Sequence, residues 1–381
     1  MHKHASVLIL TLLLVPNLSA ADIPMFRGNP EHTGVVADSA VPKGGYGIWK
    51  WRFKTGGKIR SSAALVDGVV YFGSDDGNLY ALKAADGSLV WKFATKGEVS
   101  SSPAVLNGLV YFMSADGNFR AVDSKTGRLK WMHPTGPELP FKGGWDWYLS
   151  SPVLAENTVV VGAGDGYIHA FDAIDGTKRW KFQTAGRVRA TPAISNGLVY
   201  AGSMDGNMYA LTLKSGTLKW KFKTEGSQYF PLGEIQSSPA VADGTVFFGS
   251  RDGRLYAVDA ATGKLRWRYD HQGNWVISSP AVADGLVIAG NSDGQYVDAI
   301  DMRSGQEKWK HDARVNVFSS PTVSAGVVYV GDFYAHVWFL DLKDGKPKGA
   351  YYLEERVNAS PIISDGVLYV GTDDYYFYAF E

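Results

Sequence analysis

The chain repeats itself, and this repetition constrains the fold more strongly than any other feature. Each copy opens on a Ser-Ser-Pro tripeptide or a close variant, and successive copies start 40, 49, 40, 47, 41, 41 and 40 residues apart. Eight copies of one unit predict an architecture of neighbouring, similar modules. The copies begin at Ser61, Ser101, Ser150, Ala190, Ser237, Ser278, Ser319 and Ala359.

Each copy predicts four short β-strands. Apolar stretches of four to six residues are bounded by Asp-Gly, Asn-Gly or Thr-Gly pairs, which favour tight turns. Four strands in about 41 residues are typical of one β-propeller blade. We letter the strand positions of a blade A to D in chain order: A follows the Ser-Ser-Pro start, and D carries a Gly-x-x-x-Trp signature, as in Gly263 and Trp267. The sixth copy has one extra residue between Gly294 and Ile300, for which we expect a β-bulge.

The order of the strand signatures predicts how the ring closes. A D signature at Gly47 and Trp51 precedes the first A strand, and the sequence ends at Glu381 after the last C strand. The N-terminal D strand can therefore complete the last blade and leave no open sheet edge there. The predicted fold is all-β, a single eight-bladed β-propeller of four-stranded antiparallel blades over residues 47–381. We expect the Trp residues of the D signature to pack blade against blade.

The first 20 residues predict export. Lys3 supplies a positive charge, Val7 to Val15 form an apolar run too short to span a bilayer, and small residues follow up to Ala20. We interpret residues 1–20 as a signal peptide and residues 21–46 as an N-terminal segment before the propeller. The mature protein is expected to be periplasmic or secreted, monomeric and without a membrane span.

Composition argues against several classes of function. Lys plus Arg and Asp plus Glu both number 38, so the net charge is zero and nucleic acid is not an expected partner. The absence of Cys excludes disulfides, thiolate metal sites and a Cys nucleophile. The sequence contains no P-loop, no Gly-x-Ser-x-Gly elbow and no His-Glu-x-x-His motif. The Asp-Gly pairs recur at hairpin positions, which favours turns over calcium ligands. We therefore assign no catalytic, cofactor-binding or metal-binding residue.

The copies differ most in the loop that joins strand D to the next strand A. These D–A loops are longest after Trp131 and Trp220, and a smaller extension follows Trp267. In a four-stranded blade the D–A and B–C loops lie on the same face of the disc, and function in repeat proteins tends to lie where insertions accumulate. The insertions are rich in aromatic residues. They fit a protein-binding surface, a sugar-stacking cleft, a cofactor pocket or a lid that packs on itself.

The predicted binding face combines residues of these loops with residues near the central channel. The residues directly before the A strands are expected to lie near the channel: Arg60, Ser100, Leu149, Arg189, Gln236, Ile277, Phe318 and Asn358. Two arginines at the mouth could clamp a carboxylate, or could pair with Glu98 and Glu234. The predicted binding face consists of Arg60, Glu98, Trp145, Trp147, Tyr148, Arg189, Tyr229, Phe230, Glu234, Gln236, Trp275, Arg356 and Asn358.

A signature of the form Ala-x-Asp-x-x-Thr-Gly-x-x-x-Trp, as in Ala121 to Trp131 and Ala257 to Trp267, resembles the pyrroloquinoline quinone (PQQ)-type propeller repeat. The resemblance covers about residues 47–381. One branch of this superfamily, the quinoprotein dehydrogenases, implies PQQ and calcium on the propeller axis. A second branch is similar to the propeller subunit of the outer-membrane β-barrel assembly machinery. That subunit is close to this chain in length and implies a partner protein without a cofactor, although this chain lacks the lipid-anchor Cys of the subunit. Exported propellers that open with a segment like Phe26 to Gly34 imply no defined activity.

The hypothesis we favour is an exported, non-catalytic propeller that binds a protein or glycan on its D–A face and needs no cofactor. A PQQ- and calcium-dependent dehydrogenase of alcohols or sugars is the first alternative. A polysaccharide-cleaving enzyme that uses the same aromatic face is the second.

Overall fold

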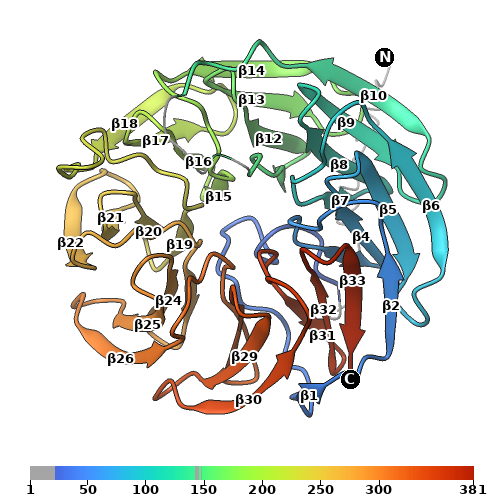
Figure 1. Ribbon diagram of the computed structural model, residues 1–381. Helices are drawn as coiled ribbons and strands as arrows, with labels where there is room; N and C mark the ends of the chain where they lie inside the picture. Colours follow the sequence, from blue (N-terminus) through green and yellow to red (C-terminus); the bar gives the residue numbers. More distant parts are fainter. Residues whose placement is uncertain (1–21, 142–145, 147) are drawn as a thin grey trace, which may run out of the picture.

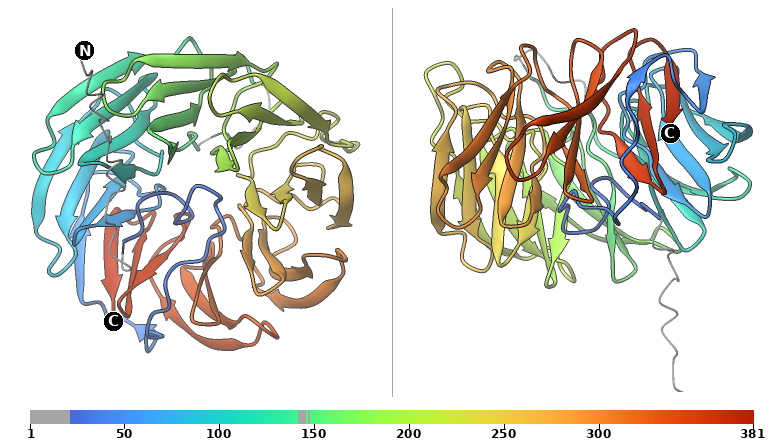
Figure 2. Two further views of the ribbon diagram at one scale, coloured as in Figure 1. Left: turned by 180° about the vertical axis from the view of Figure 1, so that it is seen from behind. Right: turned by 90° about the horizontal axis from the view of Figure 1, so that it is seen from below.

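The protein is a ring of eight β-sheets arranged around a central axis (Figure 1). The computed structural model describes residues 22–141, 146 and 148–381, and all regular structure in that part of the chain is β-strand. No helix long and apolar enough to cross a membrane occurs among the residues described. The predicted signal peptide lies outside them. Seen from the side, the ring forms a disc (Figure 2).

The blades follow one another along the chain, and in each of them strand A is innermost and strand D outermost. In the first two blades the strands are β3 (Ala64–Val66), β4 (Val69–Gly73), β5 (Asn78–Lys83) and β6 (Leu89–Ala94), then β7 (Ala104–Leu106), β8 (Leu109–Ser114), β9 (Asn118–Asp123) and β10 (Leu129–Pro134). In the third and fourth they are β11 (Val153–Ala155), β12 (Thr158–Gly162), β13 (Tyr167–Asp172) and β14 (Lys178–Gln183), then β15 (Ala193–Ser195), β16 (Leu198–Gly202), β17 (Asn207–Thr212) and β18 (Leu218–Lys223).

The second half of the ring has the same plan. The fifth and sixth blades contain β19 (Ala240–Ala242), β20 (Thr245–Gly249), β21 (Arg254–Asp259) and β22 (Leu265–Asp270), then β23 (Ala281–Ala283), β24 (Leu286–Asn291), β25 (Tyr296–Asp301) and β26 (Glu307–Asp312). The seventh contains β27 (Thr322–Ser324), β28 (Val327–Gly331), β29 (His336–Asp341) and β30 (Pro347–Tyr352). The eighth contains β31 (Ile362–Ser364), β32 (Val367–Gly371) and β33 (Tyr376–Phe380) from the C-terminus and β2 (Trp51–Lys54) from the N-terminus.

The ring closes as the order of signatures predicts. Strand β2 pairs antiparallel with β33, with Trp51 opposite Ala379 and Lys54 opposite Tyr376. The eight four-stranded antiparallel blades are thus confirmed. One addition was not predicted: the two-residue strand β1 (Gly45–Tyr46) pairs parallel with β30 and gives the seventh blade a fifth strand.

The extra residue of the sixth copy does not form the bulge that we expected. Asn291 pairs with Tyr296, so the B–C turn between β24 and β25 takes up the residue. Gln295 in this turn has a φ of 63°, in the left-handed region that tight turns use. Lengthening an exposed turn leaves the ladder of hydrogen bonds intact, whereas a bulge would interrupt it.

The Trp residues of strand D join neighbouring blades, as predicted. Trp220 illustrates the arrangement: its indole N–H donates to the carbonyl of Ala260 in the next blade (2.9 Å). Gly263 of that blade lies against the indole ring, and a Cβ at this position would lie 2.6 Å from ring atoms. The same Trp–Gly contact recurs between Trp51 and Gly87, Trp91 and Gly127, Trp131 and Gly176, Trp180 and Gly216, Trp267 and Gly305, and Trp309 and Gly345. The repeat signature is therefore the contact between blades.

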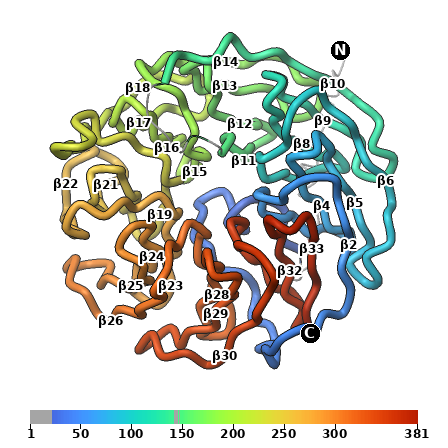
Figure 3. The backbone as a smooth tube through the Cα atoms, viewed as in Figure 1, coloured from blue at the N-terminus to red at the C-terminus, as the bar shows by residue number. Residues whose placement is uncertain are grey.

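The N-terminal segment crosses one end of the central channel, visible as the dark blue trace in the middle of the ring (Figure 3). We call residues 22–39 the plug. Its backbone bonds to the middle residues of the innermost strands, for example between Ile23 and Leu65 in the first blade and between Thr33 and Val282 in the sixth. Further bonds of this kind go to Val105, Ile194, Val241 and Val323, and Ser39 accepts a bond from Gly366 of the eighth blade. The plug thereby binds seven of the eight blades.

The D–A loops and B–C turns share one face, as the blade topology predicts. The N–H of Thr55 in the first D–A loop donates to Tyr375 O in a B–C turn (2.8 Å), and that of Gly56 donates to the Asp76 carboxylate in another (2.8 Å). The plug reaches the A–B turns, at Asp67 and Ala325, which lie at the other end of the A strands. The channel thus has a plugged end and an end beneath the D–A loops.

Candidate functional site

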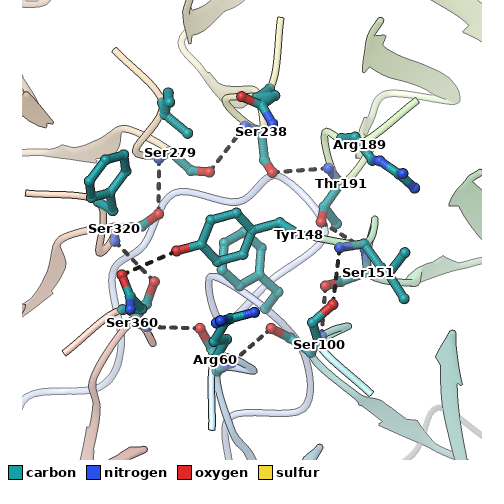
Figure 4. Close-up of a pocket in the computed structure, with 18 residues that line it drawn as sticks. Arg60, Ser100, Tyr148, Ser151, Arg189, Thr191, Ser238, Ser279, Ser320 and Ser360 are labelled. Carbon is teal, nitrogen blue, oxygen red and sulfur yellow. Dashed lines mark hydrogen bonds between the residues drawn. The ribbon is translucent and has the colours of Figure 1, made fainter. Parts of the chain in front are cut away.

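A cavity of about 70 Å³ lies on the propeller axis beneath the D–A loops (Figure 4). All of the residues expected near the channel line it: Arg60, Ser100, Leu149, Arg189, Gln236, Ile277, Phe318 and Asn358. Two aromatic side chains that do not belong to this set also line it. Tyr148 comes from the longest D–A loop, and Phe26 comes from the plug.

A closed ring of hydrogen bonds surrounds the cavity. The second residue of each Ser-Ser-Pro start donates its backbone N–H to the side-chain oxygen of its counterpart in the next blade, over 2.9–3.0 Å. The last bond runs from Ser360 back to Ser62 and so joins the two ends of the propeller. The ring consists of Ser62, Ser102, Ser151, Thr191, Ser238, Ser279, Ser320 and Ser360, and we call it the hydroxyl ring.

In the six copies that open on Ser, the first Ser has a different role, inside its own blade. Ser61 accepts the N–H of Gly73 at the end of strand B (3.0 Å), and Ser237 accepts that of Gly249 (3.0 Å). Both serines are buried. The two positions of the start therefore have different structural roles. The first hydroxyl holds strand A to strand B within a blade, and the second joins neighbouring blades.

The arginines at the channel mouth have carboxylate partners. Arg189 is 6% exposed and bonds to both Asp146 (2.8 Å) and Glu138 (2.9 Å) from the long D–A insertion. Arg187 contacts the same two carboxylates. Arg60 pairs with Asp75 of the first B–C turn (3.1 Å). The pairs of Arg187 and Arg189 with Glu138 and Asp146 therefore hold the long D–A insertion to the propeller.

Three of the predicted residues meet around a buried arginine that sequence reasoning missed. Arg251 is 1% exposed, and its guanidinium lies over the rings of Trp275 (5.2 Å), Phe141 (5.4 Å) and Phe230 (5.8 Å). Its Nε donates to Gln236 (2.8 Å). Phe230 and Trp275 also touch edge to face, with centroids 4.7 Å apart.

Two D–A insertions and the extension after Trp267 therefore interlock around Arg251 as a lid. The position before Asp-Gly in the B–C turn carries Asp75, Ala115, Gly164 and Met204 in the first four copies. Only the fifth copy has a long cationic side chain, Arg251, at this position. This departure from the repeat is the signal that could have identified Arg251 in the sequence.

A cluster of acids and bases lies where the ends of the propeller meet. Lys58 pairs with Asp373 (3.1 Å), and the Asn358 amide donates to the same carboxylate (3.1 Å). Asp75 lies nearby, and burial raises the pKa of Asp75 to about 6 although the charge of Arg60 acts to lower it. Tyr148 bonds weakly to Asn358 (3.5 Å), and burial also raises the pKa of the Tyr148 hydroxyl.

The raised pKa of Asp75 predicts a pH dependence of stability. Between about pH 4 and 6 the folded protein holds a proton that the unfolded chain, with an Asp pKa of about 3.9, has released. The contribution of Asp75 to the free energy of unfolding is therefore highest when this group is protonated at low pH, and it falls as the pH rises through 6 and the buried carboxylate ionises. We expect Asp75→Asn to be more stable than the wild type by about 1–3 kcal/mol at pH 7.5, and equal to it at pH 4. Urea unfolding across this range measures the difference, with the exposed Asp312→Asn as the control. A difference that does not change with pH would contradict the prediction.

The remaining predicted residues are spread over the D–A face. Tyr229 is 81% exposed at the tip of the second insertion, Glu98 and Arg356 are also exposed, and Glu234 is partly buried. Arg356 lies over the ring of Phe333 (4.9 Å). Trp145 and Trp147 lie outside the described residues. The structure thus brings together the axial residues and the lid residues and leaves the side chains of Tyr229, Glu98 and Arg356 exposed on the same face.

The cavity does not fit PQQ with calcium. Calcium is bound by oxygen ligands in which carboxylates predominate, whereas the described residues that line the cavity include no carboxylate but do include Arg60 and Arg189. The volume of about 70 Å³ holds a few water molecules, against roughly 300–1,000 Å³ for an ordinary small-molecule pocket. In the described part of the chain no group of three or more His, Asp or Glu side chains is arranged to hold a metal ion.

The fold and the Trp–Gly contact define an eight-bladed propeller of the PQQ-repeat class. More specifically, the chain belongs to the family described as outer membrane protein assembly factor BamB, whose model matches residues 33–145, 138–237, 228–351 and 294–381. No curated protein sequence matches the chain.

Solved structures share the fold at low sequence identity. BamB from Moraxella catarrhalis is 18% identical with a TM-score of 0.73, and the match covers 86% of this chain and 98% of that one. A europium-containing methanol dehydrogenase is 15% identical with a TM-score of 0.77, covering 93% and 91%. The computationally designed protein Ika8 is 19% identical with a TM-score of 0.72, covering 88% and 99%. A designed protein, an assembly factor and an enzyme thus share this architecture, so the fold alone does not decide the function.

Proposed function

We propose that the protein is an exported, non-catalytic scaffold that binds a protein or glycan partner on its D–A face. The observation that carries the proposal is the apolar surface on that face. Tyr229 (81% exposed) and Leu232 (53%) project from the second insertion, and Tyr334 (69%) and Tyr375 (41%) project from B–C turns. Large exposed aromatics on one face are typical of interaction surfaces.

The B–C turns of the last two blades support this proposal. In most copies the turn reads x-Asp-Gly, but the seventh and eighth carry Tyr334 and Tyr375 in its place. Tyr375 has a φ of 74°, a conformation that costs a tyrosine more than a glycine. On the outer rim, the exposed Leu218 lies beside the charged Lys219. Isolated exposed leucines need no functional explanation.

Family membership fits a scaffold exported to the cell envelope. The matching family model is described as an outer membrane protein assembly factor. The cavity, with two arginines and no carboxylate in its lining, offers no calcium site of the kind that a quinoprotein dehydrogenase would need. The acids near the mouth, Asp75 and Asp373, are each paired with a base, which is a sufficient structural role for them.

Site-specific photo-cross-linking tests the proposal. A photoreactive phenylalanine replaces Tyr229 or Tyr334, and in the control it replaces Leu218, which is exposed on the rim. We expect discrete adducts with envelope proteins or glycans at the two D–A positions, at least about fivefold above the rim position. Tyr229→Ala combined with Tyr334→Ala should weaken capture of the same partner by about 1–3 kcal/mol, or roughly five- to 150-fold, without changing the melting temperature.

Two activity assays separate this function from its alternatives. Dye-linked oxidation of alcohols or sugars by protein incubated with PQQ and calcium would favour a dehydrogenase. Release of new reducing ends from polysaccharides would favour a cleaving enzyme. Adducts confined to the rim, or none at all, would contradict the scaffold.

A further inference from the structure

A charged side chain is buried in the plug without a counter-ion. Arg27 is 6% exposed, and one Nη donates to the carbonyl of Pro321. Its Nε and its other Nη are buried and have no hydrogen-bond partner among the residues described, and the guanidinium lies 6.0 Å from the centre of the Phe26 ring. Burial is what lowers the pKa of Arg27, to about 9, so the guanidinium keeps its charge at neutral pH. No hydrogen bond from its guanidinium to a carboxylate occurs among the residues described.

The surroundings of Arg27 hold the side chain in place. A Cβ at Gly34, whose φ is 68°, would overlap the second Nη of Arg27, so the guanidinium packs directly on backbone. His32 is fully buried beside it. Burial, and then the charge of Arg27, lower the pKa of His32 to about 3, so this imidazole is neutral at neutral pH. A buried cation without an acidic partner is costly, and such groups are ordinarily paired.

The hydroxyl ring can supply hydrogen-bond donors to the axial cavity. Each ring oxygen accepts one backbone N–H, which leaves its own O–H proton to donate. No bond in which a ring hydroxyl donates occurs among the described residues, and all eight side chains are buried. Figure 4 shows six of these residues, Ser151, Thr191, Ser238, Ser279, Ser320 and Ser360, arranged around the cavity with the Tyr148 ring across its centre.

The cavity of the hydroxyl ring adjoins the space around Arg27. A second cavity, of about 10 Å³, is lined by Arg27 and shares Phe26, Ser62 and Ser360 with the axial one. Neither cavity has a carboxylate in its lining. The axial cavity thus presents the ring hydroxyls and the guanidinium groups of Arg60 and Arg189, and Arg27 lines the adjoining small cavity.

We propose that the axial cavity binds a small inorganic oxyanion, of the size and charge of phosphate or sulfate, through the hydroxyl ring and the charge of Arg27. Oxygen atoms of the anion would accept bonds from ring hydroxyls such as Ser62 and Ser360, and its charge balances the buried guanidinium. The site lies on the axis beneath the D–A loops and shares Arg60 and Arg189 with the predicted binding face, and it gives the plug a second role as the carrier of a cation.

Water alone does not meet both requirements. A few water molecules fill about 70 Å³ and accept bonds from the hydroxyls. They leave the charge of Arg27 without a counter-ion in a region of low dielectric, where uncompensated charge is most expensive. A tetrahedral anion meets the need for acceptors and the need for negative charge together.

Equilibrium dialysis of the purified protein with radiolabelled inorganic phosphate tests the proposal. We expect saturable binding of about one phosphate per chain, competed by sulfate, in buffer whose ionic strength is held constant with sodium gluconate. In the same buffer the melting temperature should rise by several degrees and level off as the site fills. Less than about 0.1 phosphate per chain after long incubation would overturn the proposal, because the cavity would then hold water.

Variants assign the site to its residues. Arg27→Met keeps the bulk of the stem but removes the charge, and we expect at least a tenfold loss of phosphate affinity and no saturable shift in melting temperature. Arg314→Met, which removes an 86% exposed cation, is the matched control and should behave like the wild type. Phosphate and sulfate also stabilise proteins non-specifically, so an equal shift in Arg27→Met and wild type would overturn the proposal. Should Arg27→Met fail to fold, the dialysis on the wild type still decides.

Discussion

Deleting the plug, residues 22–39, is expected to lower the free energy of unfolding by more than about 5 kcal/mol. The deletion removes the backbone hydrogen bonds to the inner strands, each worth about 1 kcal/mol net. It also exposes the apolar surface that Ile23 and Met25 bury, at about 1.5–3 kcal/mol for each side chain. Because a domain is stable by only about 5–15 kcal/mol, this loss approaches the whole of its stability.

Thermal and urea unfolding of the truncated protein, produced in the mature form, measure the effect. A synthetic peptide of residues 22–39 added in trans should restore part of the melting temperature, which distinguishes loss of the plug from general damage. Met25→Ala is a milder variant. Its side chain packs in a cluster with residues of the second, third and fourth blades, so we expect a loss of about 2–5 kcal/mol. A truncated protein that melts within about 2 °C of the full one would contradict the role of the plug.

The architecture could be predicted because the motifs that form the contacts within and between blades recur in the repeat. Ser-Ser-Pro, Asp-Gly and Gly-x-x-x-Trp recur at fixed offsets, and the structure shows why: Ser61 holds strand A to strand B, Ser62 holds blade to blade, and Trp51 packs on Gly87. Because each motif occupies a fixed position in the blade, it indicates where every neighbouring residue of the repeat lies as well as which fold forms. That is why the residues before each A strand could be placed on the axis without coordinates.

The plug could not be predicted because its contacts follow no repeat. Residues 22–39 show neither the alternation of a strand nor the periodicity of a helix. Their hydrogen bonds go to backbone groups of inner strands, which any sequence would present. The sequence did single out Phe26 to Gly34 as a segment shared with other exported propellers, but no pattern indicated that Arg27 would be buried without an acid.

The blade topology predicted that the D–A loops and B–C turns share one face, but it did not predict how side chains pair on that face. Arg189 pairs with Glu138 and Asp146, which the sequence places 51 and 43 residues away inside an insertion without periodicity. Asp75 and Asp373 come together only because the ring closes between the first and last blades. Pairs that depend on the path of an irregular loop or on ring closure leave no mark on local sequence.

Gly263→Ala is expected to lose stability for two reasons that can be measured separately. One is the backbone conformation of this recurring turn glycine, and the other is the packing of an indole ring against it. Gly263 has a φ of 70°, which by itself makes alanine about 1 kcal/mol less stable there. A Cβ would also lie 2.6 Å from the buried indole of Trp220, so the ring must move and stretch its bond to Ala260. Overpacking of this kind costs about 1–3 kcal/mol more.

Gly68→Ala is the matched control for Gly263→Ala. Gly68 has the same φ of 70°, but a Cβ there would meet nothing within 4 Å. We expect Gly68→Ala to lose about 1 kcal/mol in urea unfolding and Gly263→Ala to lose about 2–4 kcal/mol, with a change in near-UV circular dichroism only for the latter. Equal losses would mean that the glycine is required for its backbone conformation alone. A larger loss at Gly263 would show that the Thr-Gly pair is retained in the repeat because the Trp of the preceding blade packs on it.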